Sequence, residues 1–96
     1  MSYWNYRVIR RYHEESETET FHIHEVYYSD DHNIEAWTAS AIAPMGETLP
    51  ELQEDIEFMA KAFEGPVLVE KSESGKEILV EFEEVIHEEK RQKRRY

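Results

Sequence analysis

The stretch His24-Glu25-Val26-Tyr27-Tyr28-Ser29-Asp30-Asp31-His32-Asn33-Ile34-Glu35-Ala36-Trp37 decides how this chain folds. Two arms rich in aromatic and β-branched residues flank the polar residues 29–33, a pattern typical of a β-hairpin. The turn contains no glycine, although a tight turn of this length usually needs one residue at positive φ. We expect Asn33 or His32 to adopt that conformation, and asparagine tolerates it best.

Further strands are predicted around this hairpin because apolar and polar residues alternate along them. A polar connection at 14–19 precedes the second strand, and a turn at 72–75 precedes the last one. Pro44 forces Ala43 into an extended conformation, so the third strand ends just before it. The predicted strands run from Tyr3 to His13, from Thr20 to Tyr28, from Ile34 to about Ile42, over Val67–Val69 and from Lys76 to Phe82.

A helix is predicted at about 49–64. Thr48-Leu49-Pro50-Glu51 fits a capping box, in which Thr48 accepts from the first turn, Glu51 returns to the Thr48 amide and proline occupies a position that needs no donor. Gly65 ends the helix in the left-handed C′ conformation. One apolar stripe is expected to face the sheet, namely Leu52, Ile56, Met59 and Phe63, while the solvent side carries Glu51, Glu54, Asp55, Glu57 and Lys61.

The order β-β-β-α-β predicts an α+β fold with a three- to five-stranded, mainly antiparallel sheet and one principal helix. Ninety-six residues allow one domain. We assign residues 1–89 to it and residues 90–96 to a basic C-terminal tail. Residues 83–94 either complete the last strand or form a short C-terminal helix, which the order of acids before bases favours.

Charge is distributed unevenly along the chain. All 22 acidic residues and six of the 11 basic ones precede residue 90, so residues 1–89 carry −16 and the last seven carry +5, with histidine neutral. A body this acidic repels phosphate, and we expect no nucleic-acid binding by its surface. A solvated tail that folds back on the acidic body is the simplest interpretation. The remaining nucleic-acid candidates are Arg91, Lys93, Arg94 and Arg95, beside Lys90.

Several classes of protein are disfavoured by composition. The absence of cysteine excludes a disulfide framework and thiolate chemistry. No apolar run approaches the roughly 18 residues of a membrane span, and the first residues lack the apolar stretch of a signal peptide. We therefore expect a cytoplasmic bacterial protein that makes no membrane contact.

Two histidines are the strongest metal-ligand candidates. His22 and His24 lie two residues apart on a strand, so their side chains point the same way, about 6–7 Å apart. Such a pair can chelate zinc or nickel. Glu25 faces away, however, and a third ligand would have to come from His13 or His87. Hydrogen-bonded packing is the commoner role of strand histidines, and we predict no metal and no cofactor.

Catalytic patterns are missing from the sequence. None of the serines lies in a Gly-X-Ser-X-Gly elbow, and the three glycines form no phosphate-binding loop. With so many carboxylates, a chance pair is no sign of acid–base catalysis unless burial raises one pKa. We therefore expect a non-enzymatic protein.

Aromatic residues crowd onto the first three predicted strands. Their simplest role is core and cross-strand packing. A single helix covers only one face of a sheet, however, and an uncovered aromatic face usually marks an interface. We predict a two-fold homodimer. Its interface would include Tyr28, Trp37, Tyr6 and Trp4.

Residues 5–68 resemble a group of small uncharacterised bacterial proteins, which implies a compact bacterial domain and carries no activity. The resemblance lies in Asn5-Tyr6-Arg7-Val8-Ile9, His24-Glu25-Val26-Tyr27-Tyr28, Trp37-Thr38, Pro44-Met45-Gly46-Glu47-Thr48, Leu52 to Asp55, Met59, Ala62-Phe63 and Pro66-Val67-Leu68.

More distantly, three strands followed by Gly46-Glu47-Thr48-Leu49-Pro50-Glu51-Leu52 resemble the N-terminal domain of HicB-like antitoxins, where a Gly-acid-Thr sequence opens the single helix. This resemblance implies that the chain wraps a small basic toxin nuclease, a partner that an acidic body would suit.

The sequence thus predicts an acidic, non-enzymatic protein-binding or accessory module that acts as a homodimer. A HicB-like binder of a basic protein partner is one alternative. A small metal-binding protein or enzyme built on His22 and His24 is the other.

Overall fold

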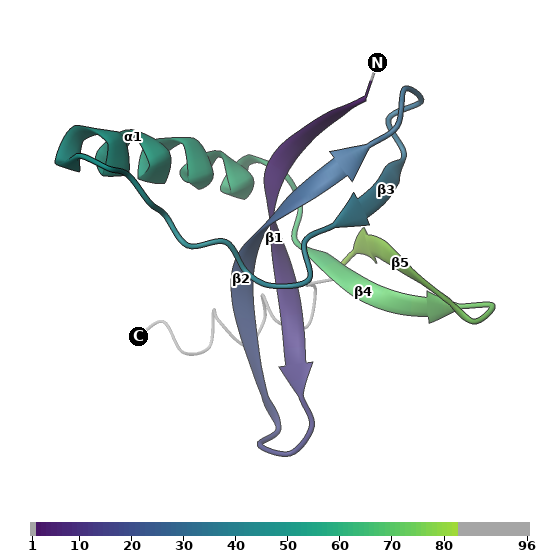
Figure 1. Cartoon of the computed structure of the whole chain (residues 1–96). Coiled ribbons are helices and arrows are strands. Elements are labelled where there is room, and N and C mark those ends of the chain that lie inside the picture. Colours follow the sequence, from purple (N-terminus) through teal and green to yellow (C-terminus); the bar gives the residue numbers. More distant parts are fainter. Residues whose placement is uncertain (1, 83–96) are drawn as a thin grey trace.

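Five strands and one helical segment follow one another in the computed structural model, which describes residues 2–82 (Figure 1). The fold class is α+β, as predicted. The proposed C-terminal helix and the basic tail lie outside the described residues. The elements are β1 Tyr3–His13, β2 Thr18–Tyr28, β3 Ile34–Trp37, α1 Leu49–Met59, the 3₁₀ helix η1 Ala60–Glu64, β4 Leu68–Glu73 and β5 Lys76–Glu81.

The strands form one sheet in the order β3-β2-β1-β4-β5. Only β1 and β4 pair in parallel, with Ile9 opposite Leu68, so the sheet is mainly antiparallel, as predicted. The long β1–β2 ribbon pairs continuously from Tyr3 opposite Tyr28 to His13 opposite Thr18. Its turn end projects beyond the rest of the sheet (Figure 1).

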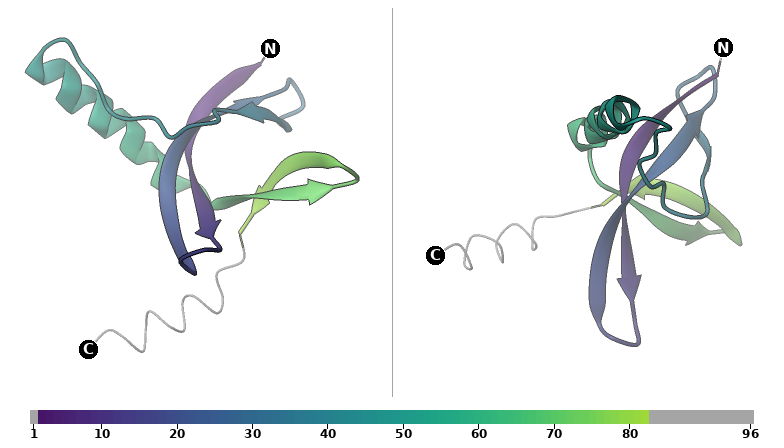
Figure 2. Two further views of the ribbon diagram at one scale, coloured as in Figure 1. Left: turned by 60° about the horizontal axis from the view of Figure 1, so that its bottom comes forward. Right: turned by 60° about the vertical axis from the view of Figure 1, so that its left-hand side comes forward.

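The helical segment packs on one side of the sheet, which we call the helix side. Figure 2 shows α1 extending away from the sheet, so that its C-terminal end and η1 make the contact. Met59 and Ala62 are accordingly its only buried residues. The core of the helix side consists of Tyr6, Val8, Met59 and Ala62, with Ile23, Ile42 and Val67 packed against it.

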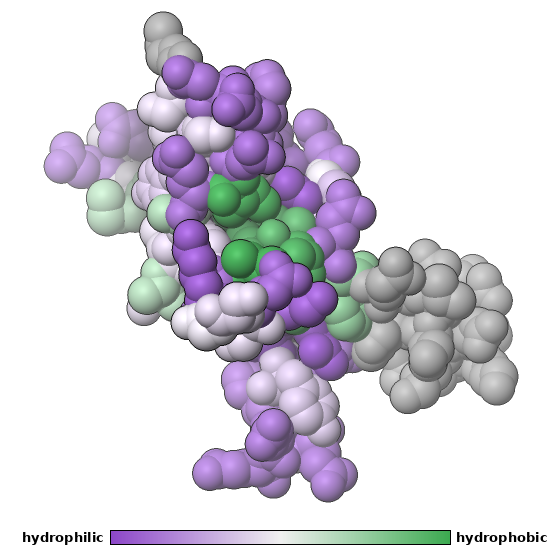
Figure 3. Space-filling model, turned by 90° about the vertical axis from the view of Figure 1, so that its right-hand side faces the viewer, coloured by the Kyte–Doolittle hydropathy of each residue, from purple (hydrophilic) through white to green (hydrophobic). Residues whose placement is uncertain are grey.

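The opposite side of the sheet, which we call the Trp37 side, holds a second core. Figure 3 shows hydrophobic residues gathered in a hollow on the side where the β4–β5 hairpin projects, with hydrophilic residues around them. Its buried residues are Ile9, Val26, Tyr28, Leu68 and Leu79, and Ile34 and Trp37 pack against them.

The third strand is shorter than predicted, because β3 ends at Trp37 and does not reach Ile42. The Thr38 hydroxyl accepts a hydrogen bond from the Glu25 amide at 3.3 Å, and the chain then bends. The Thr38 amide still donates to Glu25 O, and backbone pairing with β2 then returns at Ile42, whose amide donates to Ile23 O. The Thr38 side chain thus replaces a backbone acceptor in the hydrogen-bond ladder between β2 and β3, and β3 ends there.

The predicted apolar stripe of the helix is wrong in two positions. Ile56 is 49% exposed and Phe63 is 74% exposed. The helix tightens into η1 after Met59, and the larger turn per residue of a 3₁₀ helix places Ala62 toward the sheet instead of Phe63. Gly65 is also extended, with φ −103°, and not left-handed.

Turn geometry accounts for the other differences. In the β2–β3 turn the positive φ predicted for Asn33 or His32 is adopted by His32, at 68°. β2 begins at Thr18 instead of Thr20. β4 continues to Glu73, beyond the predicted Val67–Val69, because the β4–β5 turn needs only two residues at positive φ, as in type I′ hairpins. These are Ser74 and Gly75.

Candidate functional site

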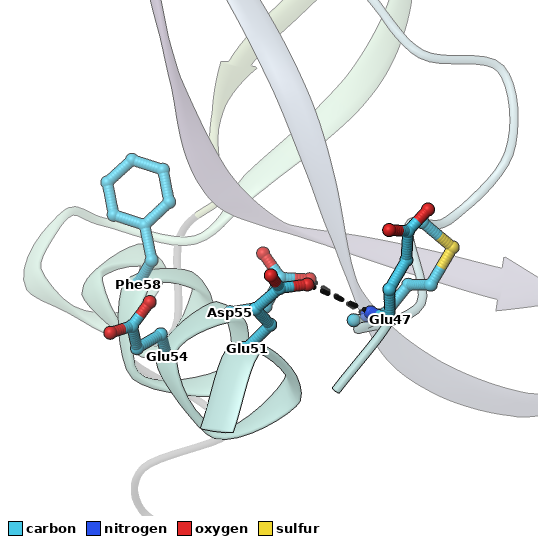
Figure 4. Close-up of a pocket in the computed structure, with 7 residues that line it drawn as sticks. Glu47, Glu51, Glu54, Asp55 and Phe58 are labelled. Atoms are coloured by element: carbon cyan, nitrogen blue, oxygen red, sulfur yellow. Dashed lines mark hydrogen bonds between the residues drawn. The ribbon is translucent and has the colours of Figure 1, made fainter. Parts of the chain in front are cut away.

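A pocket of about 480 Å³ lies between the first half of α1 and the loop that leads into it (Figure 4). We call it the acidic pocket because four of its seven lining residues are carboxylates and none is basic. The lining residues are Met45, Gly46, Glu47, Glu51, Glu54, Asp55 and Phe58.

Helix capping holds the loop against α1. Thr48 Oγ1 accepts from the Glu51 amide at 3.3 Å, which confirms the predicted N-cap. The Glu51 carboxylate accepts from the Glu47 amide at 3.0 Å, one residue before the Thr48 amide that a standard capping box would use. Asp55 accepts from the Met45 amide at 2.9 Å (Figure 4). Two carboxylates of the pocket therefore fix the loop that forms its other wall.

Gly46 allows the loop to approach the helix this closely. A Cβ atom at this position would lie 2.7 Å from the Glu51 carbonyl carbon and 2.8 Å from Leu52 Cα. Both are backbone atoms, so no side-chain movement could relieve the clash. A larger residue at position 46 would have to push the loop away from α1 and open the pocket.

An aromatic cluster adjoins the acidic pocket through Phe58, which belongs to both. Its ring meets Tyr6 edge to face at 5.4 Å and Trp4 at 6.0 Å between centroids, and Trp4 meets Tyr6 at 5.1 Å. Trp4 and Phe58 remain 43% and 46% exposed. Such T-shaped contacts orient the rings without covering them, so aromatic surface is available beside the carboxylates.

The pocket is electrostatically negative. Burial raises the pKa of the Tyr6 phenol, and the nearby charges of Asp55 and Glu25 raise it further. Carboxylates and aromatic faces are the two kinds of group that bind cationic side chains, the first through charge-assisted hydrogen bonds and the second through cation–π contact. The arrangement is therefore suited to lysine or arginine side chains.

The two candidate metal ligands take hydrogen bonds with different partners. His22 Nε2 lies 2.8 Å from Thr20 Oγ1, and that hydroxyl also lies 2.8 Å from His13 Nε2. His24 is 1% exposed, and its Nδ1 donates to Thr38 O at 2.9 Å. Within residues 2–82 no three potential ligands lie close enough to hold a metal ion. His87, the other proposed third ligand, lies outside the described residues.

The four predicted interface residues lie in different environments. Tyr28 and Tyr6 are buried within the chain at 6% and 9% exposure, so neither presents its ring to a partner in this structure. Trp37 is half-buried and Trp4 is exposed. The structure thus brings Tyr6 and Trp4 together in the aromatic cluster and places Tyr28 and Trp37 on the other side of the sheet.

Trp37 takes part in a polar network that the sequence did not indicate. Its Nε1 donates to one oxygen of Glu70 at 2.7 Å, and Arg11 donates to the other oxygen at 2.7 Å. A second cavity of about 400 Å³ opens beside these three residues and Glu77. Because Glu70 is already paired through both oxygens, this cavity offers less free acceptor capacity than the acidic pocket.

The sequence placed Glu51 and Glu54 correctly on the exposed surface of α1, whereas Asp55 is half-buried against the loop, and the pocket itself was not predicted. The capping pattern was its only signal, because the fold-back of the loop depends on long-range packing. The nucleic-acid candidates Arg91, Lys93, Arg94 and Arg95 lie outside the described residues.

No helix among residues 2–82 combines the length and apolar character needed to cross a membrane. Comparison of the chain with protein-family models, with curated proteins and with solved structures gives no match.

Proposed function

We propose that this protein is a non-enzymatic protein-binding module and that the acidic pocket, with the adjoining rings of Trp4 and Phe58, binds a basic segment of a partner protein. One observation supports this most strongly: four carboxylates line the same pocket as an aromatic ring that is nearly half exposed. The pocket's own hydrogen bonds hold its loop in place, so the carboxylates are positioned before a partner arrives.

The expected partner is a protein segment with several lysine or arginine residues. A single exposed ion pair contributes only about 0–1 kcal/mol, so useful affinity requires several pairs together with aromatic contact. The net charge of −11 would also accelerate association with a basic protein. A cytoplasmic binder of a small basic toxin, as in HicB-like antitoxins, is the narrower form of this proposal.

We also propose that two copies associate. On β1 and β2, several aromatic rings stay between one-third and one-half exposed, and exposed apolar surface of this kind often marks a protein–protein interface. The most exposed are Tyr12 and Phe21, at 49% each, at the end of the ribbon that α1 does not cover. Sedimentation at micromolar concentration should give about twice the monomer mass of 11.6 kDa. A monomer at high concentration would contradict self-association.

The binding proposal is tested by affinity capture from the native cell with three baits. These are the wild type, a pocket variant with Glu47→Gln and Glu54→Gln, and a control with Glu14→Gln and Glu15→Gln in the β1–β2 turn. The two variants lose the same charge, but only the first alters the pocket. A basic protein should be recovered with the wild type and the control and lost with the pocket variant. Equal recovery with both variants would contradict a role for the pocket.

A further inference from the structure

The exposed surface of the helical segment carries apolar residues along one side and acidic residues along the others. Leu49, Ile56 and Phe63 are spaced by seven residues, which keeps them near one side of a helix, and they are 77%, 49% and 74% exposed. Lys61 is the only base between residues 47 and 64, against six acids. The acids are Glu47, Glu51, Glu54, Asp55, Glu57 and Glu64.

The charge of this surface restricts what can cover it. Pairing α1 with α1 of a second copy would bring two segments of net charge −5 together, and like charges at an interface are unfavourable. A segment that is basic, with some apolar residues, would match both properties. The chain itself contains one such segment, residues 90–96, which carries five bases, no acid and a terminal tyrosine.

The described chain ends close to this helix. Phe82 donates its amide proton to Val67 O at 2.8 Å, and Val67 packs in the same core as Met59 and Ala62. Val67 follows the end of η1 by three residues. Figure 1 shows the end of β5 beside the start of β4, where the helical segment joins the sheet. Phe82, the last described residue, therefore lies near the C-terminal end of the helical segment.

The remaining length of chain is sufficient to reach the acidic pocket. Eleven α-helical and five 3₁₀ residues give the helical segment a length of about 26 Å. Lys90 lies eight positions after Phe82, and eight residue steps span at most about 26–29 Å. The bases can thus reach the first half of α1, while Val85 and Ile86 can reach no farther than the part nearer Phe63.

We propose that residues Lys90–Tyr96 dock on the acidic pocket and the adjoining exposed acidic surface of α1 of the same chain. The tail then occupies the surface that binds a basic partner, and a partner must displace it. This consequence rests on the proposed function, whereas the docking itself does not. The tail would act as an internal competitor whose strength falls as salt rises.

Paramagnetic relaxation in the full-length protein tests the docking directly. The chain has no cysteine, so Tyr96→Cys provides a single attachment point for a nitroxide. At low salt the amide signals of Glu51, Glu54 and Asp55 should lose the most intensity. The loss should disappear in about 1 M salt, where the Debye length is about 3 Å.

Two charge variants of the labelled protein provide matched controls. Glu47→Gln with Glu54→Gln should weaken the intensity loss on α1, and Glu14→Gln with Glu15→Gln should leave it unchanged. Equal or greater loss at Glu14–Glu17, which are also acidic, would overturn the proposal, because it would show attraction to acidic surface in general. Loss that spreads evenly over the chain would overturn it as well.

A mixed sample identifies which chain supplies the tail. Isotope-labelled protein without nitroxide is combined with nitroxide-labelled protein without isotope, and the α1 signals should keep their intensity. Intensity loss in this mixture would overturn docking within one chain and assign the tail to a second copy. The result is independent of partner capture, since a docked tail with no captured protein would leave the docking intact and count only against the proposed function.

Discussion

The two sides of the sheet are stabilised in different ways. On the helix side, Met59 and Ala62 pack against Tyr6 and Val8, and the buried groups are almost entirely apolar. On the Trp37 side an apolar core lies next to buried or half-buried polar residues. These are His24, Arg7, Arg11, Glu70 and Trp37, which are joined to Thr38, Tyr28, Pro66 and one another by hydrogen bonds.

This difference shows how a sheet with one helix can close its second side. Glu70 belongs to β4 and Trp37 to β3, which β1 and β2 separate in the sheet. Three strand spacings would put them about 14 Å apart in a flat sheet. Their hydrogen bond at 2.7 Å therefore indicates that the sheet curls toward the Trp37 side. The helical segment covers the core of the helix side. The core of the Trp37 side is covered by the curvature of the sheet, which the polar network holds in place.

Removing an apolar residue from the core of the Trp37 side should have the largest effect. Ile9 is fully buried, and Ile9→Ala should cost about 2–5 kcal/mol of unfolding free energy through lost transfer energy and a cavity. Urea unfolding provides the measurement. Ile56→Ala on the exposed side of α1 is the control and should cost about 0.5 kcal/mol or less. If both variants unfolded at the same denaturant concentration, this core would not be closed in solution.

Loss of the tryptophan hydrogen bond should have the next largest effect. Trp37→Phe keeps most of the aromatic volume but removes the donor to Glu70, and bonds to charged groups are typically worth about 1.5–3 kcal/mol. We expect a loss of unfolding free energy near the lower end of this range, because Glu70 is partly exposed and keeps its ion pair with Arg11. Trp4→Phe removes an exposed indole and should be nearly neutral by comparison. A neutral Trp37→Phe would show that curvature does not depend on this bond.

The helix cap should contribute less. Thr48→Ala leaves a first-turn amide without its acceptor and should cost about 1 kcal/mol. Because only the C-terminal end of the helical segment packs on the sheet, the loss should appear mainly as fraying of the first turn, measurable by amide hydrogen exchange. Glu54→Gln, one turn later, should leave exchange near the wild-type level. Unchanged exchange in Thr48→Ala would place the start of the helix elsewhere.

The smallest effect at neutral pH should come from the buried histidine. Burial lowers the pKa of His24 below its usual value of 6.5, although the hydrogen bond to Thr38 O opposes the shift, and Arg11 and His22 lower it further. The unfolded chain therefore binds a proton more readily than the folded one. This contribution is fully present above pH 6.5 and is lost as the pH falls through the folded pKa.

Urea midpoints measured between pH 7.5 and 5 test this dependence. The wild-type midpoint should fall as the pH decreases. His24→Gln should remove the part of this decrease that His24 causes, whereas His13→Gln on the exposed ribbon should keep it. A wild-type midpoint that does not fall between pH 7.5 and 5 would contradict neutral burial of the His24 imidazole. The remaining ring atom, Nε2, is buried without a partner among the described residues, so protonation would leave a second donor unsatisfied.

Features that depend on neighbouring residues were predicted well. The hairpin at residues 29–33 follows from its turn composition and flanking arms, and the helix start follows from Thr48 and Pro50. The acidic character of α1 can be read directly from its residues. The predicted start of β2 and the predicted end of β3 were wrong by a few residues. Phe63 was predicted to face the sheet but is exposed. In two of these, Thr38 entering a backbone ladder and a helix tightening where it meets the sheet, the outcome depends on packing partners distant in sequence.

The sequence by itself determined the α+β class, the N-cap and the negative charge, because each depends on local propensity or on composition. Only the tertiary structure decided that Gly46 brings the loop against α1, that Glu70 joins Trp37 to Arg11, and that His24 is buried. These contacts connect residues separated by up to 59 positions along the chain. These contacts depend on the curvature of the sheet and on the close approach of segments distant in sequence, and no local sequence pattern specifies either property.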